Sequence, residues 1–350
     1  MSAAAKTAEA AVTTMRAMVM PEAKGRFRLE ERPLPAPGRR EVRIRVHACG
    51  VCHSDALLVE GEIPGLAYPR IPGHEVIGVV DALGPEVQGW EPGTRVGVGW
   101  SPGFCGYCNR CRHGDSFACE NLHGATGITR DGGYATHMLA DVTALVRVPA
   151  ALGAVESAPL LCAGVTTFNA LRNSGAKAAQ TVAVIGVGGL GHLAVQFAAR
   201  QGYRTVAIDR GQDKEALARS LGAHDFIDGA VQDPAAALQA MGGAKTILAT
   251  VTSAKAMEAI VGGLAPNGTM MVIGAVGALT INSLDLIGKS AAVRGWYSGM
   301  AVDSEDTLRF SELNHVASMN EVFPFEEAQA AYDRMMSGEA RFRVVLKIAG

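Results

Sequence analysis

The chain has 350 residues, of which 48% are hydrophobic and 19% are charged, and this balance excludes wholesale disorder. Its formal net charge of −2 argues against a basic surface for nucleic acid or an acidic membrane. At about 150 residues per domain, the length predicts two domains. Glycine is in excess, with 42 residues against a typical share of about 7%, which indicates turns or close approach of the backbone to a ligand.

The first residues predict a tail rather than a targeting segment. Residues 1–15 are rich in alanine and lack the apolar stretch of a secretory signal, so we expect disorder there, with Met15 as an alternative start. Glycines interrupt the apolar runs, which are shorter than the about 20 residues of a membrane span. We therefore expect a cytoplasmic protein, in which clustered cysteines indicate metal rather than disulfides.

Two kinds of pattern follow along the chain. Residues 16–150 are predicted to be rich in β-strands, because short apolar runs (42–46, 76–80 and 94–98) are separated by Pro-Gly turns. From residue 165 to 290, short apolar runs alternate with helical patterns of about ten residues, which predicts parallel βαβ units. A helix is expected near 325–336 and a last strand at 342–348.

Four cysteines form a compact motif. Cys105, Cys108, Cys111 and Cys119 have the spacing C-x2-C-x2-C-x7-C, which suits a closed tetrahedral site for structural zinc. Bacterial ferredoxins use a final gap of three residues and a following proline, and neither occurs here. The acidic balance disfavours a zinc ribbon that binds nucleic acid.

A glycine-rich loop predicts a dinucleotide site. The segment Gly186, Val187, Gly188, Gly189, Leu190 and Gly191 is G-x-G-x-x-G between an expected strand (181–185) and an expected helix (190–200). Its glycines allow a tight turn and the approach of a pyrophosphate to the helix N-terminus. Asp209 ends the next expected strand, where an acid binds the ribose hydroxyls of NAD, whereas the adjacent Arg210 is the kind of residue that accommodates the 2′-phosphate of NADP.

Three further residues form a candidate catalytic metal site. Cys52, His74 and Cys162 make up the Cys2His set of a catalytic zinc with one open position. Their spacing alone does not join them, since a lone cysteine in an apolar stretch is usually a core residue. Their occurrence beside a dinucleotide motif favours the metal site. Cys49 is then left over as a small buried residue.

Together and in this order, these motifs resemble the zinc-dependent medium-chain alcohol dehydrogenases, over nearly the whole chain after Met15. The resemblance implies an α/β protein with a GroES-like, β-rich catalytic domain at 16–164. A Rossmann domain, a doubly wound parallel sheet that binds NAD, would follow at 165–300. A return segment at 301–350 would complete the catalytic domain, with the active site in the cleft between the domains.

The resemblance also assigns roles to single residues. At the catalytic zinc, Glu75 would approach the metal, Asp55 would orient the ligand histidine and Ser54 would take the alcohol proton. The other implied contacts are His53 and Arg343 at the pyrophosphate, Thr166 and Leu190 behind the nicotinamide, Lys214 at the adenosine ribose and Trp100 in the substrate pocket. Plain alternatives are a solvated charge for Lys214 and Arg343 and core packing for Leu190 and Trp100.

One position departs from the family pattern. Many members carry a histidine at the outer end of a proton relay, where this chain has Leu57. The relay cannot end on that imidazole, so we predict that the proton passes from Ser54 through the cofactor ribose to water. Leu57 and Ile63 give the pocket apolar bulk, which favours primary aliphatic or aromatic alcohols, while secondary alcohols stay possible.

The expected function is reversible hydride transfer between an alcohol and NAD, with two zinc ions per chain, giving an aldehyde or ketone. The alternatives are an NADP-dependent aldehyde reductase of the cinnamyl-alcohol-dehydrogenase type, a non-catalytic zinc-stabilised nucleotide-binding protein and a zinc-free quinone reductase. The expected partner is a small alcohol or aldehyde, with no nucleic acid and no membrane. The resemblance implies a homotetramer or homodimer.

Overall fold

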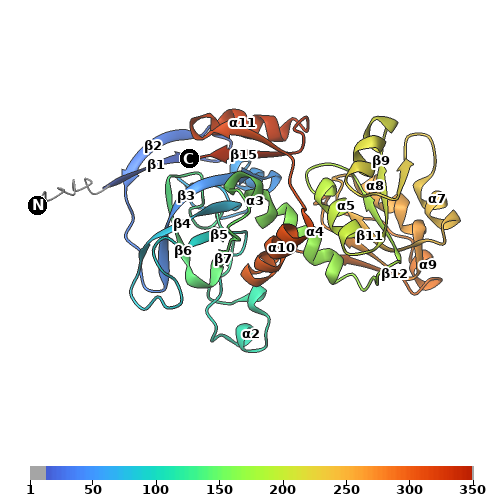
Figure 1. Cartoon of the computed structure of the whole chain (residues 1–350), viewed down its shortest axis with the longest axis horizontal. Coiled ribbons are helices and arrows are strands. Elements are labelled where there is room, and N and C mark those ends of the chain that lie inside the picture. The colour runs from blue at the N-terminus through green and yellow to red at the C-terminus, as the bar shows by residue number, and fades with distance from the viewer. Residues whose placement is uncertain (1–12, 349–350) are drawn as a thin grey trace, which may run out of the picture.

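The structure is a computed structural model that describes residues 13–348, and it contains two bodies along its long axis (Figure 1). One body is built mainly from antiparallel strands and the other from a parallel sheet with helices. Two helices, α4 (Ala163–Arg172) and α10 (Ala301–Asn314), lie between them. No helix among residues 13–348 is long and apolar enough to cross a membrane.

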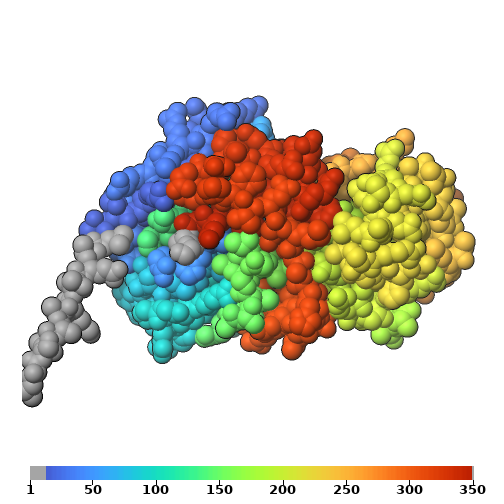
Figure 2. Space-filling model, turned by 45° about the horizontal axis from the view of Figure 1, so that its top comes forward, coloured from blue at the N-terminus to red at the C-terminus, as the bar shows by residue number. Residues whose placement is uncertain are grey.

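The first body is organised around a seven-stranded sheet of order β14-β15-β3-β4-β5-β7, with β6 also paired to β3. Strand β15 lies antiparallel to β3, with Leu346 opposite Cys49, so the end of the chain completes a sheet begun near its start. Figure 2 shows the last part of the chain, in orange to red, lying against the blue and green first body and beside the yellow second body. The strands are β3 (Glu41–Val51), β4 (Val76–Leu83), β5 (Arg95–Val98), β6 (His137–Asp141), β7 (Leu145–Arg147), β14 (Asn320–Pro324) and β15 (Arg343–Lys347).

A separate two-stranded sheet changes the boundary of the expected tail. Strand β1 (Thr14–Val19) pairs antiparallel with β2 (Arg28–Pro33), and Thr14 and Met15 lie opposite Pro33 and Arg32. The prediction of disorder is wrong for these two residues, because their backbone is paired to a neighbouring strand. Thr13 also makes a backbone contact, because its carbonyl oxygen accepts a hydrogen bond from Leu34 N at 2.9 Å. Residues 1–12 of the predicted tail lie outside the described residues.

The second body confirms the predicted Rossmann architecture. Six parallel strands have the order β10-β9-β8-β11-β12-β13, which reverses between β8 and β11 and leaves a crevice at their carboxyl ends. The strands are β8 (Thr181–Ile185), β9 (Arg204–Asp209), β10 (Asp225–Asp228), β11 (Ala244–Ala249), β12 (Leu264–Val272) and β13 (Ala292–Gly295). The helices are α5 (Gly191–Arg200), α6 (Glu215–Ser220), α7 (Pro234–Ala240), α8 (Ala254–Ile260) and α9 (Ser283–Ile287).

The helices outside the Rossmann body are mostly short. They include α1 (Ala56–Val59), α2 (Asn109–Arg112), α3 (Ala154–Ser157) and α11 (Ala328–Met336). Helix α10 is long but was not predicted, because its fully buried positions are mainly small polar residues: Ser304, Thr307, Leu308 and Ser311. A helix without an apolar stripe gives no periodic signal in the sequence.

Candidate zinc sites and nucleotide cleft

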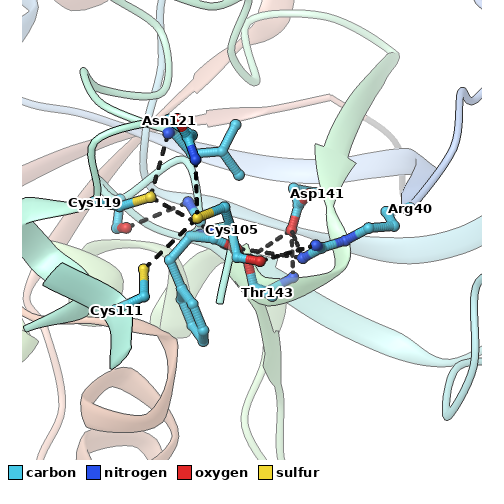
Figure 3. A network of polar contacts seen from close by, with 11 residues as sticks. Arg40, Cys105, Cys111, Cys119, Asn121, Asp141 and Thr143 are labelled. Atoms are coloured by element: carbon cyan, nitrogen blue, oxygen red, sulfur yellow. Dashed lines mark hydrogen bonds and ion pairs between the residues drawn. The ribbon is translucent and has the colours of Figure 1, made fainter. Parts of the chain in front are cut away.

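The four-cysteine motif folds into a lobe around α2 (Figure 1), and Figure 3 shows three of its cysteines, Cys105, Cys111 and Cys119, close together. The sulfurs of Cys105, Cys108, Cys111 and Cys119 all lie within 4.8 Å of one another. The backbone N–H groups of Cys105, Cys108 and Cys111 donate to the sulfurs of Cys119, Cys105 and Cys108 at 3.3, 3.3 and 3.4 Å. Thiolates held in this way form a closed S4 set that fits zinc.

Hydrogen bonding prepares Cys105 for a metal. Burial acts to raise the pKa of this thiol, but N–H donation from Tyr107 and Cys108 outweighs burial and lowers the pKa to about 6. Asn121 Nδ2 also donates to Cys105 Sγ, at 3.3 Å. Because the thiolate is the ligand form, these donors favour metal binding.

The lobe is tied to the sheet by a polar network that Figure 3 displays. The guanidinium of Arg40 donates to the carbonyl oxygens of Phe104 and Cys105 at 3.3 and 3.2 Å. Thr143 Oγ1 accepts from Phe104 N at 2.8 Å and lies 2.6 Å from Asp141 Oδ1. Arg40, Asp141 and Thr143 thereby fix the start of the cysteine loop.

The second candidate zinc site gathers residues from three separate segments. Cys52 follows β3, His74 and Glu75 precede β4, and Cys162 precedes α4. One donor atom from each of these four residues lies within 4.8 Å of the others, and the two sulfurs are 3.7 Å apart. His74 Nε2 is buried and has no hydrogen-bond partner among residues 13–348. A buried nitrogen without a partner, facing two thiols and a carboxylate, fits a zinc ion.

A buried carboxylate orients the histidine. Asp55 Oδ1 lies 3.3 Å from His74 Nδ1, which leaves Nε2 as the nitrogen available to a metal. Asp55 Oδ2 accepts hydrogen bonds from Cys52 N and from the hydroxyl of Tyr134, both at 3.0 Å. Tyr134 is fully buried and was not predicted, since only the folded sheet brings it to Asp55, 79 residues away.

The charges at this site are strongly coupled. A hydrogen bond from Cys162 and the nearby His74 lower the pKa of Cys52, in spite of burial, so Cys52 is the favoured thiolate. Burial raises the pKa of Glu75 to about 8, although the neighbouring Arg343 opposes this change. The carboxyl group of Glu75 accepts a buried hydrogen bond from the guanidinium of Arg343 in β15.

The predicted proton acceptor and substrate residues lie around the cysteines. Ser54 Oγ is 3.7 Å from Cys52 Sγ. The ring of Trp100 packs edge-on against His74, with centroids 5.0 Å apart. Leu57 is partly buried against the core of the first body and presents no polar atom.

The glycine loop lines a cavity of about 480 Å³ between the two bodies. Gly186 has φ +95°, and a Cβ on Gly191 would lie 1.7 Å from the Gly186 carbonyl oxygen, so both positions require glycine. At Gly188, by contrast, no atom lies within 4 Å of a Cβ position. The open space beside Gly188 fits a group such as a pyrophosphate at the helix N-terminus.

Asp209 closes one end of this loop. Its Oδ2 accepts from Val187 N at 2.6 Å, and its Oδ1 accepts from Lys214 Nζ at 2.8 Å and from Arg210 N at 2.7 Å. Asp209 and Lys214 line the cavity, whereas the Arg210 side chain lines a neighbouring cavity of about 420 Å³.

Most of the predicted nucleotide contacts converge on the cleft, and some do not. His53, Leu190 and Arg343 line the cavity beside the glycine loop. Thr166 is instead a buried residue of α4 and is not among the described residues that line it. Arg343, expected at a pyrophosphate, also turns its guanidinium to Glu75, because β15 runs directly past the candidate zinc site.

Several lining residues were missed from the sequence. Residues 250–253 follow β11, and Thr250 Oγ1 donates to the carbonyl oxygens of Ile185 and Gly186 at 2.8 and 3.0 Å. These residues could have been predicted, because the crevice of such a sheet lies at the carboxyl ends of the strands where the strand order reverses, here β8 and β11. Phe342 also lines the cavity and carried no such signal.

Comparisons with known proteins agree with this geometry. Residues 38–150 match the model of the alcohol dehydrogenase GroES-like domain, and residues 189–313 match that of the zinc-binding dehydrogenases. Alcohol dehydrogenase notN of Aspergillus sp. (strain MF297-2) is 43% identical over 318 residues, which cover 91% of this chain and 93% of that protein. The chain belongs to the zinc-binding medium-chain alcohol dehydrogenase family.

Solved structures support the same family. The crystal structure of AibC superimposes with a TM-score of 0.88 at 30% identity and covers 96% of both chains. The thermostable alcohol dehydrogenase from Pyrobaculum aerophilum, solved with cobalt and zinc bound, gives a TM-score of 0.84 at 28% identity, covering 96% of this chain and all of that one. With its two candidate zinc sites, the chain is a zinc-dependent alcohol dehydrogenase.

Proposed function

We propose that this enzyme interconverts a primary or secondary alcohol with its aldehyde or ketone, using NAD. The observation that carries the proposal is the four-donor cluster of Cys52, His74, Glu75 and Cys162 at the edge of the nucleotide cleft. Two residues connect the cluster with the cleft: His53, next to Cys52 in the chain, lines the cavity, and Arg343 reaches both. An alcohol carbon at the metal would thereby face a nicotinamide in the cleft.

The residues of the chain have distinct tasks in this reaction. Cys52, His74 and Cys162 would hold the zinc ion, and Asp55 keeps the imidazole in its ligand orientation. When bound, zinc supplies Lewis acidity toward the substrate oxygen and the nicotinamide exchanges the hydride. Ser54 Oγ accepts the proton of the alcohol in the oxidation and returns it in the reduction.

The proton then needs an exit from Ser54. Leu57 has no atom that accepts a proton, so the exit lies on the cleft side of the hydroxyl, toward the solvent. Trp100, Leu57 and Ile63 make the substrate side apolar, which favours aliphatic or aromatic primary alcohols.

The choice of nucleotide rests on Asp209. Its carboxylate lies at the rim of the cavity and would repel a 2′-phosphate, which favours NAD. Arg210 lines the adjacent cavity and gives weight to the second candidate, an aldehyde reductase that uses NADP. The joint presence of the Cys52, His74 and Cys162 cluster and of Ser54 beside Cys52 argues against a non-catalytic protein.

A steady-state panel tests the proposal. Alcohols and aldehydes of graded size are assayed with NAD(H) and NADP(H), together with the zinc content. We expect the highest kcat/KM for primary alcohols with NAD. Preference for NADPH and aldehydes would support the reductase instead. Light scattering of the pure enzyme tests the proposed homotetramer or homodimer.

A further inference from the structure

His192 is a buried histidine that the proposed reaction does not use. It lies in the first turn of α5, directly after the glycine loop. Its Nδ1 lies 2.9 Å from the carbonyl oxygen of Gly188, and its Nε2 lies 3.3 Å from the backbone nitrogen of Met319. A carbonyl oxygen only accepts and a backbone N–H only donates, so Nδ1 carries the proton and Nε2 accepts. The imidazole is therefore neutral and uses both nitrogens.

The surroundings keep the imidazole neutral and oriented. Burial lowers the pKa of His192 to about 4, and the charge of Arg343 acts in the same direction, while the hydrogen bond to Gly188 acts against it. The ring stacks on Phe342, with centroids 5.1 Å apart and an interplanar angle of 27°. Phe342 itself lines the nucleotide cavity.

His192 belongs to a row of side chains on α5 that hold the crossover, which we define as residues 314–319. The crossover leads from α10 into β14 and thus into the sheet of the first body. Arg200 Nε donates to the carbonyl of Asn314 at 3.1 Å, and the Gln196 amide bonds both to O and to N of Ala317, at 2.9 and 3.1 Å. Residues four apart lie on one helix face, so three side chains of α5 form hydrogen bonds with the backbone of the crossover.

The backbone of Met319 connects His192 with Arg343, which lies beside the candidate zinc site. Its N–H donates to His192, and its carbonyl oxygen accepts the N–H groups of Phe342 and Arg343 at 2.8 and 2.9 Å. The Arg343 side chain lies 3.3 Å from a Cβ position on Gly189 and pairs with Glu75. An unbroken series of hydrogen bonds thus joins Gly188, His192, Met319, Arg343 and Glu75.

We infer that His192 is a positioning residue for the dinucleotide, which holds Arg343 against the glycine loop through the Met319 peptide. The inference rests on the proposed function, because Arg343 and the loop are the proposed pyrophosphate contacts. His192 also fixes the loop itself, since Gly188 O accepts both its N–H, at 3.0 Å, and its Nδ1–H. In a trans peptide the next N–H points the opposite way, so the N–H of Gly189 is directed away from the imidazole.

Three substitutions separate the two hydrogen bonds of His192, the one to Gly188 O and the one to Met319 N. His192→Gln places an acceptor near the position of Nε2 and can keep the bond to Met319. His192→Asn places a donor near the position of Nδ1 and loses that bond. His192→Phe keeps the ring on Phe342 and loses both. The readouts are the Kd of NADH or NADPH, whichever the wild type binds more tightly, the KM and kcat values, and the zinc content.

We expect His192→Phe and His192→Asn to raise the Kd and the nucleotide KM about 10-fold, the effect of about 1.4 kcal/mol, with kcat changed less and two zinc ions retained. His192→Gln should stay within about twofold of the wild type. Equal Kd values for all four proteins would overturn the inference, as would a loss in the Gln variant equal to that in the Phe variant. A wild type that binds neither nucleotide would instead contradict the proposed function.

Gln196→Leu is the matched control, because it loosens the same crossover without touching Gly188 or Met319. It should lower the Tm and leave the Kd within about twofold. A 10-fold higher Kd for this variant would show that the loss of any contact to the crossover weakens nucleotide binding, and it would overturn the specific role of His192. In an Arg343→Gln background, His192→Phe should add less than about twofold to the Kd, and an undiminished 10-fold effect there would refute the route through Arg343.

Discussion

At the scale of single residues, the chemistry depends on how buried polar atoms are paired. Asp55 accepts hydrogen bonds from Cys52 N and from the Tyr134 hydroxyl, and its Oδ1 lies 3.3 Å from His74 Nδ1, which leaves His74 Nε2 for a metal. The zinc ligands could be predicted from the sequence, because cysteine and histidine are the usual ligands of zinc and occur here beside a dinucleotide-binding motif. The pairing of Glu75 with Arg343 was not predictable, since it joins residues 268 positions apart through the register of β15 on β3.

Asp209 gives a test of nucleotide choice at this scale. Asp209→Gly removes the carboxylate proposed to bind the ribose and leaves Lys214 without its partner at 2.8 Å. We expect the KM for NAD to rise about 10-fold and the use of NADP to improve, because an unpaired cation attracts a phosphate. Steady-state kinetics with both nucleotides measures the ratio.

Asp213→Ala is the control for this change. Asp213 lies in the turn before α6 and is exposed, so its loss alters the local charge without touching the glycine loop. An unchanged cofactor ratio in Asp209→Gly, or the same shift in Asp213→Ala, would refute the role of the Asp209 carboxylate.

At the scale of elements, local patterns predicted most strands of the Rossmann body and the glycine loop between β8 and α5. These elements bury apolar residues at regular intervals, so the sequence carries their period. The patterns did not predict helix α10, because this helix buries small polar side chains against α4. The course of the crossover 314–319 was not predicted either, since side chains of α5 hold its backbone and its own residues show no periodic pattern.

Two glycines of the loop should respond in opposite ways. Gly188→Ala puts a methyl group into open space, so the free enzyme should keep its Tm while the Kd of the nucleotide rises at least about 10-fold. Gly191→Ala puts a methyl group 1.7 Å from the Gly186 carbonyl, so it should destabilise the fold by about 1–3 kcal/mol. Thermal unfolding and nucleotide titration of both variants measure this contrast, and the reverse pattern would contradict the proposed cradle.

At the scale of the whole molecule, late segments join the two bodies. Strand β15 completes the first sheet, and the crossover fastens that sheet to α5 of the second body. The family resemblance implied a return segment, but the bonds that fasten it follow only from the folded contacts.

The buried His192 predicts how stability changes with pH. Its pKa is about 4 in the folded chain and 6.5 without perturbation, so the unfolded state binds more protons between these values. Stability therefore decreases as the pH falls from 6.5 toward 4, by on the order of 3 kcal/mol from this group. His192→Gln should lack this component, so the difference in unfolding free energy between wild type and variant should shrink at low pH. A difference that is constant from pH 7 to pH 4 would contradict the neutral, buried imidazole.

Cys52, His74 and Cys162 are proposed to hold a catalytic zinc ion beside a cleft that binds the nucleotide independently. The most direct measurement is the zinc content of the wild type and of Cys162→Ala, together with alcohol oxidation and NADH binding. We predict about two zinc ions in the wild type. The variant should hold about one zinc ion, show no turnover and keep its NADH affinity, because the structural lobe and the glycine loop are untouched. One zinc ion in the wild type, or full activity in Cys162→Ala, would contradict the account.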